Sequence, residues 1–133
     1  MASSGQDDLR KAIKLFNRWQ FQEAADAFAT LADEAEGSDR QFLLGLAEIS
    51  QGFFRIWHKN GEANAMVEYL TKGMEMLKPF PKGALGIQAD QMQQLLAGCL
   101  QEAKRWLRGD SELFNRDFIP RLTYISKTGA IEE

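Results

Sequence analysis

Residues 40–59 read RQFLLGLAEISQGFFRIWHK, and this stretch decides the fold of the chain. Apolar side chains recur in it at spacings of three and four residues, namely at Phe42, Leu46, Ile49, Phe53 and Ile56. That spacing places them on one face of a helix. Further apolar residues widen the face, namely Leu43, Ala47, Phe54 and Trp57. A helix that is apolar over so much of its circumference needs neighbours on two or more sides, so the stretch predicts a central helix.

The same periodicity predicts four more helices. They span about residues 7–19, 21–36 and 62–78, and from residue 87 or 89 to about 107. Gly37 suits a left-handed helix cap, Asn60-Gly61 favours a turn, and Pro79 cannot continue a helix. No stretch alternates apolar and polar residues as a β-strand would. We therefore predict an all-α fold of about five helices, in antiparallel hairpins similar to those of tetratricopeptide repeats.

The chain is expected to form one domain, because 133 residues can bury a core without disulfides or metals. Residues 1–6 are small and polar and predict a flexible leader, and residues 7–110 form the helical domain. The tail, residues 111–133, is too apolar for a disordered end, and Pro120 breaks any long helix there. We expect a helical turn near residues 111–116, followed by extended chain packed on the domain or on a partner.

Composition narrows the class of protein. A net charge of −3, without a basic face interleaved with aromatic residues, argues against nucleic-acid binding. No apolar run approaches the roughly 20 residues that span a bilayer, and the first residues carry no signal-peptide pattern. The single cysteine, Cys99, excludes an internal disulfide and leaves the redox compartment undecided, with cytosol or stroma favoured over secretion. We expect a soluble protein of the cytoplasm or plastid stroma, with no membrane span and no nucleic-acid partner.

Two charged residues interrupt the predicted central helix. Glu48 and Arg55 are seven residues apart on one helix face, slightly too far for a direct ion pair. Either a third residue bridges them, or they form a partly solvated polar edge. If buried, each needs a charged partner, because an isolated buried charge is very costly. They are candidate interaction residues, together with Trp57 and His58.

His58 is the only histidine and lies at the end of the central helix. A protonated imidazole there would complement the helix dipole as a structural cap. The functional alternative is a general base or metal ligand, but a transition metal needs several ligands converging at one point. Cys99 lies among leucines on the fifth helix, where a thiol behaves as a small apolar side chain. We expect no catalytic residue, no metal and no cofactor.

Three segments together resemble a known helical family. They are LFNRWQFQEAADAFATLADEA (15–35), FLLGLAEISQGFFR (42–55) and NGEANAMVEYLTKGMEMLKPF (60–80). Over roughly residues 12–106 the chain resembles the bacterial, cyanobacterial and plastid family called domain of unknown function three hundred and nine. The most specific shared pieces are Leu15-Phe16-Asn17, Phe21, Gly45-Leu46, Asn60, the helix exit from Leu77 to Pro79, and the helix entry Gly86-Ile87.

The resemblance implies a His-x-x-x-Glu-x-x-Trp hallmark on the second helix and a further His late on the third. The matching positions here hold Ala25, Ala29, Ala32 and Arg55. Alanine offers no metal ligand, base or nucleophile, so a site of that kind is not expected in this chain. The three alanines instead predict a smooth, close-packing helix face.

These observations favour a non-enzymatic helical module that binds another protein or peptide. One alternative is a small metal-dependent, hydrolase-like enzyme of the resembled family. The other is a small-molecule binder, since Trp19, Trp57 and Trp106 could line a cavity among the phenylalanines.

Overall fold

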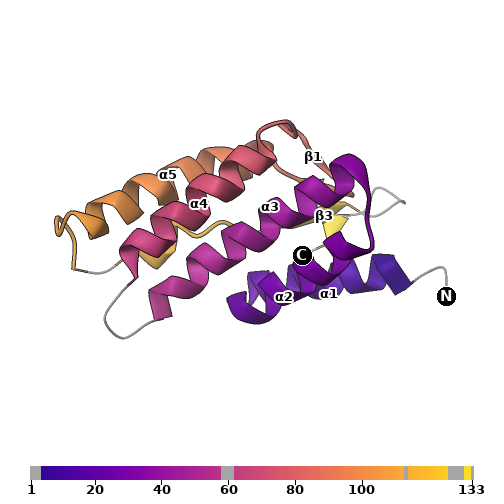
Figure 1. The fold of residues 1–133 in the computed structure, drawn as a ribbon, viewed down its shortest axis with the longest axis horizontal. Coiled ribbons are helices and arrows are strands. Elements are labelled where there is room, and N and C mark those ends of the chain that lie inside the picture. The colour runs from indigo at the N-terminus through magenta and orange to yellow at the C-terminus, as the bar shows by residue number, and fades with distance from the viewer. Residues whose placement is uncertain (1–3, 58–61, 113, 126–130, 133) are drawn as a thin grey trace.

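The computed structural model describes residues 4–57, 62–112, 114–125 and 131–132. Its α-helices are α1 (Ser4–Asn17), α2 (Phe21–Asp33), α3 (Gly37–Phe54), α4 (Ala63–Leu77) and α5 (Asp90–Leu107). These five helices pack against one another (Figure 1), which confirms the helical class predicted as all-α. Helix α1 begins at Ser4, three residues before the predicted start at Asp7.

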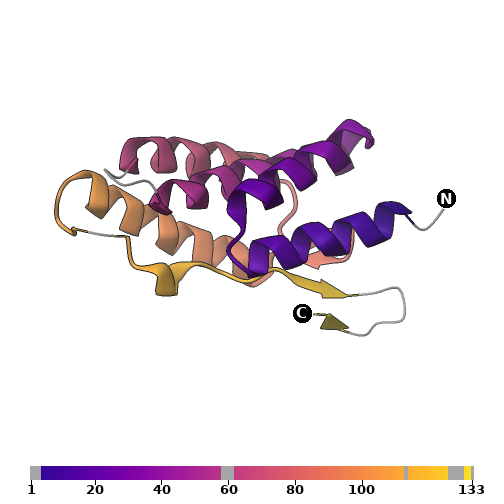
Figure 2. The same ribbon diagram turned by 90° about the horizontal axis from the view of Figure 1, so that it is seen from below.

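The helices form two layers, which Figure 2 shows edge-on. One layer contains α2, α3 and α4, and the other contains α1, α5 and the C-terminal tail. Helix α3 lies between α2 and α4 and packs against both, so the apolar stretch that begins at Arg40 forms the centre of its layer. Its Phe53 is fully buried, and the ring centroids of Phe16 and Phe21 lie 6.0 and 5.4 Å from the Phe53 centroid. Aromatic contacts therefore join α3 to both helices of the first hairpin.

The connection from α1 to α2 is tight because Trp19 adopts a left-handed backbone conformation, with φ 63°. Its N–H donates to the carbonyl of Phe16 at 2.9 Å, and the N–H of Gln20 donates to the carbonyl of Leu15 at 2.9 Å. This pair of hydrogen bonds is the Schellman motif, in which glycine usually takes the left-handed position. The motif reverses the chain within three residues, so α2 packs back against α1.

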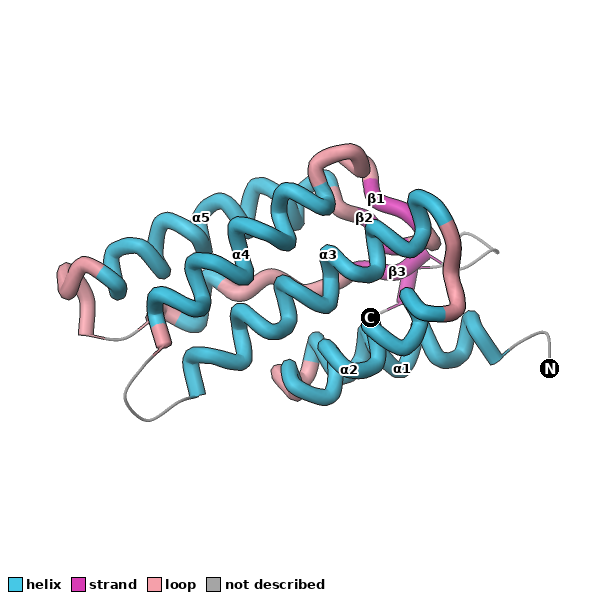
Figure 3. The backbone as a smooth tube through the Cα atoms, in the orientation of Figure 1, coloured by secondary structure: helices cyan, strands magenta, loops and turns pink. Residues whose placement is uncertain are grey.

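The chain also contains short strands, which no alternating pattern in its sequence indicated. A small antiparallel sheet of order β1-β2-β3-β4 stands at one end of the helical layers (Figure 3). Its strands are β1 (Gly83–Ala84), β2 (Ile87–Gln88), β3 (Thr123–Ile125) and β4 (Ile131–Glu132). Strands of two or three residues are too short to show an alternating pattern. Leu85 and Gly86, with φ of 55° and 82°, make the two-residue turn typical of tight hairpins between β1 and β2.

The C-terminal tail crosses the layer of α1 and α5 as extended chain (Figure 2). Four of its apolar side chains are buried, namely Phe114, Ile119, Leu122 and Tyr124, whereas Phe118 is exposed. The helical turn expected near residues 111–116 is instead a 3-10 turn, η2, at Arg116–Phe118. The turn begins later because the side chain of Asn115 caps it, accepting a hydrogen bond from the N–H of Asp117 at 3.0 Å. The tail therefore packs on the domain through residues 114–125.

Candidate interaction surface

Helices α3 and α4 approach each other closely because glycines replace side chains where they cross. A Cβ atom at Gly73 of α4 would lie 3.0 Å from the carbonyl oxygen of Gly45 and 2.7 Å from Cδ1 of Ile49. A Cβ at Gly45 would lie 2.9 Å from Cδ2 of Leu77. Both distances to side chains are shorter than real Cβ contacts, so a larger residue at either position would force Ile49 or Leu77 to shift. The close approach brings side chains of the two helices together along their solvent side.

We call this solvent side the α3–α4 seam and define it by the residues that line its two hollows. From α3 and its 3-10 extension, η1 (Arg55–Trp57), it comprises Gly37, Arg40, Gln41, Leu44, Glu48 and Arg55. From α4 and the residue before it, the seam comprises Glu62, Ala65, Glu68, Tyr69, Lys72, Glu75 and Met76. Both sets recur at spacings of three, four or seven residues, so each forms one stripe along its helix. In Figure 1, α3 and α4 lie toward the viewer, whereas the tail passes behind them.

One end of the seam is a polar hollow of about 520 Å³. Nη1 of Arg55 donates to Oε2 of Glu62 at 2.9 Å, and Nη2 donates to the hydroxyl oxygen of Tyr69 at 3.2 Å. The guanidinium carbon also lies 5.0 Å from the centroid of the Tyr69 ring, within the range of a cation–π contact. Glu48 pairs with Lys72, with 3.2 Å between Oε1 and Nζ. Ion pairs between the helices thus hold this end of the seam in place.

One of the two sequence interpretations expected a third residue to bridge Glu48 and Arg55. Among the described residues these two instead pair with different partners. Glu48 pairs with Lys72 of α4, and Arg55 pairs with Glu62, the residue before α4. The antiparallel α4 brings these partners nearer than Glu48 and Arg55 are to each other, because two helical turns separate those two. Their side chains are 22% and 20% exposed, so both lie on a partly solvated edge. Sequence reasoning missed Glu62, Tyr69 and Lys72, although their spacing along α4 predicts one helix face.

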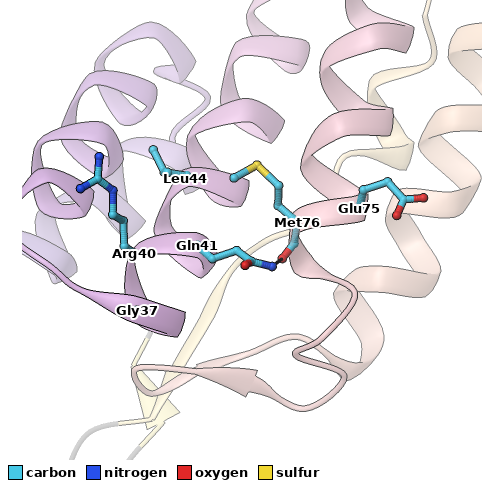
Figure 4. Close-up of a pocket in the computed structure, with 6 residues that line it drawn as sticks. All are labelled: Gly37, Arg40, Gln41, Leu44, Glu75 and Met76. Carbon is cyan, nitrogen blue, oxygen red and sulfur yellow. Dashed lines mark hydrogen bonds between the residues drawn. The ribbon is translucent and has the colours of Figure 1, made fainter.

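The other end of the seam is a more apolar hollow of about 460 Å³ (Figure 4). The side chain of Met76 points toward that of Leu44 across the seam. Nε2 of Gln41 donates to the carbonyl oxygen of Met76 at 3.1 Å and ties the helices together here. Arg40 flanks this hollow on the α3 side, and Glu75 flanks it on the α4 side with its carboxylate turned toward α5.

The alanines predicted to form a close-packing face lie on α2, across α3 from the seam, and do not line it. Ala25 and Ala32 are buried and Ala29 is half-buried. The backbone of Trp57 ends η1, whereas His58 and the side chain of Trp57 lie outside the described part of the chain. The seam therefore contains Glu48 and Arg55 but not the alanines.

Cys99 lies under the tail. Its thiol donates a hydrogen bond to the carbonyl oxygen of Phe118 at 2.9 Å, and burial raises the pKa of the thiol to about 12. The group is protonated at neutral pH, whereas a reactive cysteine is a thiolate. Among the residues that the structure describes, no three His, Cys, Asp or Glu side chains group so as to hold a metal ion.

No α-helix within the described ranges is both long and apolar enough to cross a membrane. In comparisons with known proteins, no protein-family model matches this chain, and no curated protein matches it significantly.

Proposed function

We propose that this chain is a non-catalytic module that binds another polypeptide along the α3–α4 seam. The observation that carries the proposal is the form of the seam, which has an apolar hollow at one end and a polar hollow at the other. Extended grooves between packed helices are a common way to recognise a polypeptide. The replacement of the resembled family's polar hallmark by Ala25, Ala29 and Ala32 supports a non-catalytic role.

The ion pairs and hydrogen bonds across the seam support binding because they fix its side chains before a partner arrives. Arg55 is held by Glu62 and by the Tyr69 hydroxyl, and Gln41 is held by a backbone carbonyl. Close contact at Gly45 and Gly73 limits sliding of one helix along the other. A surface whose side chains are already ordered loses less conformational entropy when it binds.

The experiment compares two charge-reversed forms of the full chain as affinity baits in a lysate of the native host. The seam variant is Arg40→Glu with Lys72→Glu, and the matched control is Lys11→Glu with Lys14→Glu on α1. Each variant reverses two positive charges, so both change the net charge equally. All four side chains are exposed, so neither variant disturbs the core. Equal thermal midpoints establish that both variants are folded.

Quantitative mass spectrometry then separates the outcomes. We expect at least one protein to be retained by the wild-type chain and by the α1 control but lost from the seam variant. Retention of the same proteins by all three baits would overturn the seam as the binding surface. Loss from both variants would show that net charge, rather than the seam, governs binding.

A further inference from the structure

Three charged side chains of the seam make no ion pair within the described residues, namely Arg40, Glu68 and Glu75. The side chains of Arg40 and Glu68 are exposed. The other cations of the seam, Arg55 and Lys72, are already paired with Glu62 and Glu48. Glu75 lines the apolar hollow but also lines the neighbouring hollow between α4 and α5, toward which its carboxylate turns. The charges left for a partner are therefore positive at the Arg40 end and negative at the Glu68 end.

The spacing of these charges follows from the pairing of the helices. The Glu48–Lys72 ion pair places residues 48 and 72 at the same level of the antiparallel hairpin. Arg40 is eight residues before Glu48 on α3, and Glu68 is four residues before Lys72 on α4. Because the helices run in opposite directions, these offsets add to twelve residues. At about 1.5 Å per residue, the two charges are about 18 Å apart along the seam.

We propose that the partner is an amphipathic α-helix that lies along the seam parallel to α3, and this inference rests on the proposed function. Helices carry acidic residues in the first turn and basic residues in the last, where they complement the helix dipole. In the parallel orientation, the acidic first turn meets Arg40 and the basic last turn meets Glu68. An apolar side chain from the same face of the partner enters the hollow between Leu44 and Met76.

Site-directed photocross-linking of the full chain tests this orientation. A benzophenone amino acid replaces Arg40 in one preparation and Glu68 in a second, and it replaces the exposed Lys11 of α1 in a control. Each preparation is irradiated in a lysate of the native host, and the cross-linked residues are identified by mass spectrometry. We expect the Arg40 and Glu68 probes to mark one segment of one protein, absent from the control.

The order and spacing of the two cross-linked residues in the partner test whether it is a helix parallel to α3. For a parallel helix, the residue marked from position 40 precedes the residue marked from position 68 by about twelve residues, since a helix rises about 1.5 Å per residue. The reverse order would overturn the orientation. A separation of about five or six residues would indicate an extended peptide, which rises about 3.3 Å per residue. Either result would overturn the inference while supporting the proposed function.

Two further outcomes complete the test. If neither seam probe marks a protein beyond those marked from position 11, both the inference and the proposed function are wrong. If a segment is found in the expected order, a synthetic peptide of that segment should bind the Glu68→Lys chain about fivefold more weakly than the wild-type chain, as expected for one surface charge contact. Unchanged binding would show that charge does not set the orientation.

Discussion

Asn17 at the end of α1 holds Leu122 of the tail by two hydrogen bonds between its side chain and the backbone. Nδ2 of Asn17 donates to the carbonyl oxygen of Leu122 at 3.0 Å, and the N–H of Leu122 donates to Oδ1 of Asn17 at 2.8 Å. The residues are 105 positions apart in the sequence. One side chain thus satisfies both backbone groups of a buried residue in the extended tail, as a neighbouring strand would.

Replacing Asn17 with alanine should destabilise the domain by about 2 kcal/mol, because both backbone groups of Leu122 lose their partner near the core. Chemical denaturation measures the free energy of unfolding. Asn64→Ala, at an exposed position on α4, is the matched control and should change stability by less than about 0.5 kcal/mol. An equal effect of the two alanine variants would show that the Asn17–Leu122 contact does not hold the tail.

The close approach of α3 and α4 predicts different effects for two helical glycines. Gly73→Ala should destabilise the domain by about 1–3 kcal/mol, because its Cβ would press on the Gly45 carbonyl and on Ile49. Gly98→Ala on α5 should be neutral or stabilise by up to about 1 kcal/mol, because its nearest neighbour would be the Phe118 ring at 3.6 Å and alanine favours the helix. Denaturant midpoints compare the two variants, and a midpoint for Gly73→Ala equal to that of wild type would show that α3 and α4 can move apart freely.

Removal of the Phe53 ring tests the centre of the core. Phe53→Ala should cost about 3–5 kcal/mol, the usual range for deleting a buried phenylalanine. Phe118, which is 39% exposed, provides the control, and Phe118→Ala should cost much less. Both free energies of unfolding come from denaturant titration. An unchanged denaturation midpoint for Phe53→Ala would place its ring outside the core.

Cys99 reports on whether the tail stays in place. Because burial raises the pKa of its thiol and the tail covers it, native protein should react with iodoacetamide at pH 8 far more slowly than unfolded protein. Asn17→Ala should speed the reaction by loosening the tail, whereas Asn64→Ala should not. Alkylation of native wild-type protein as fast as unfolded protein would contradict the observed cover over Cys99.

The same thiol makes stability depend on pH in the alkaline range. Burial raises the pKa of Cys99 from its ordinary value of 9.0 to about 12 in the folded chain. The unfolded state therefore releases the proton first, so this contribution is complete below pH 9 and is lost as the pH rises toward 12. Between pH 8 and 11 the free energy of unfolding should fall more steeply for wild type than for Cys99→Ala. Parallel curves would show that Cys99 is not buried when folded.

The sequence alone predicted the helices, because their apolar residues recur at the helical period over twelve or more positions. Phe53 and its neighbours on α3 could be assigned to the core for that reason. The polar edge at Glu48 and Arg55 was also visible, because charges inside an apolar helix are unusual. The partners of these two residues were not, since Glu62 and Lys72 reach them only after α4 folds back along α3.

Other features depend on contacts that no local pattern encodes. Strand β2 has two residues, and its pairing of Ile87 with Tyr124 joins segments 37 positions apart. The hold of Asn17 on Leu122 spans the chain from the first helix to the tail. The helical period of 3.6 residues can be recognised from side chains that are close in the sequence. These pairings, in contrast, form only when packing brings distant backbone groups within hydrogen-bond distance. The sequence by itself determined the helices and most of their buried faces, although Leu95, on the predicted stripe of α5, is exposed. Only the tertiary structure decided the sheet, the path of the tail and the composition of the seam.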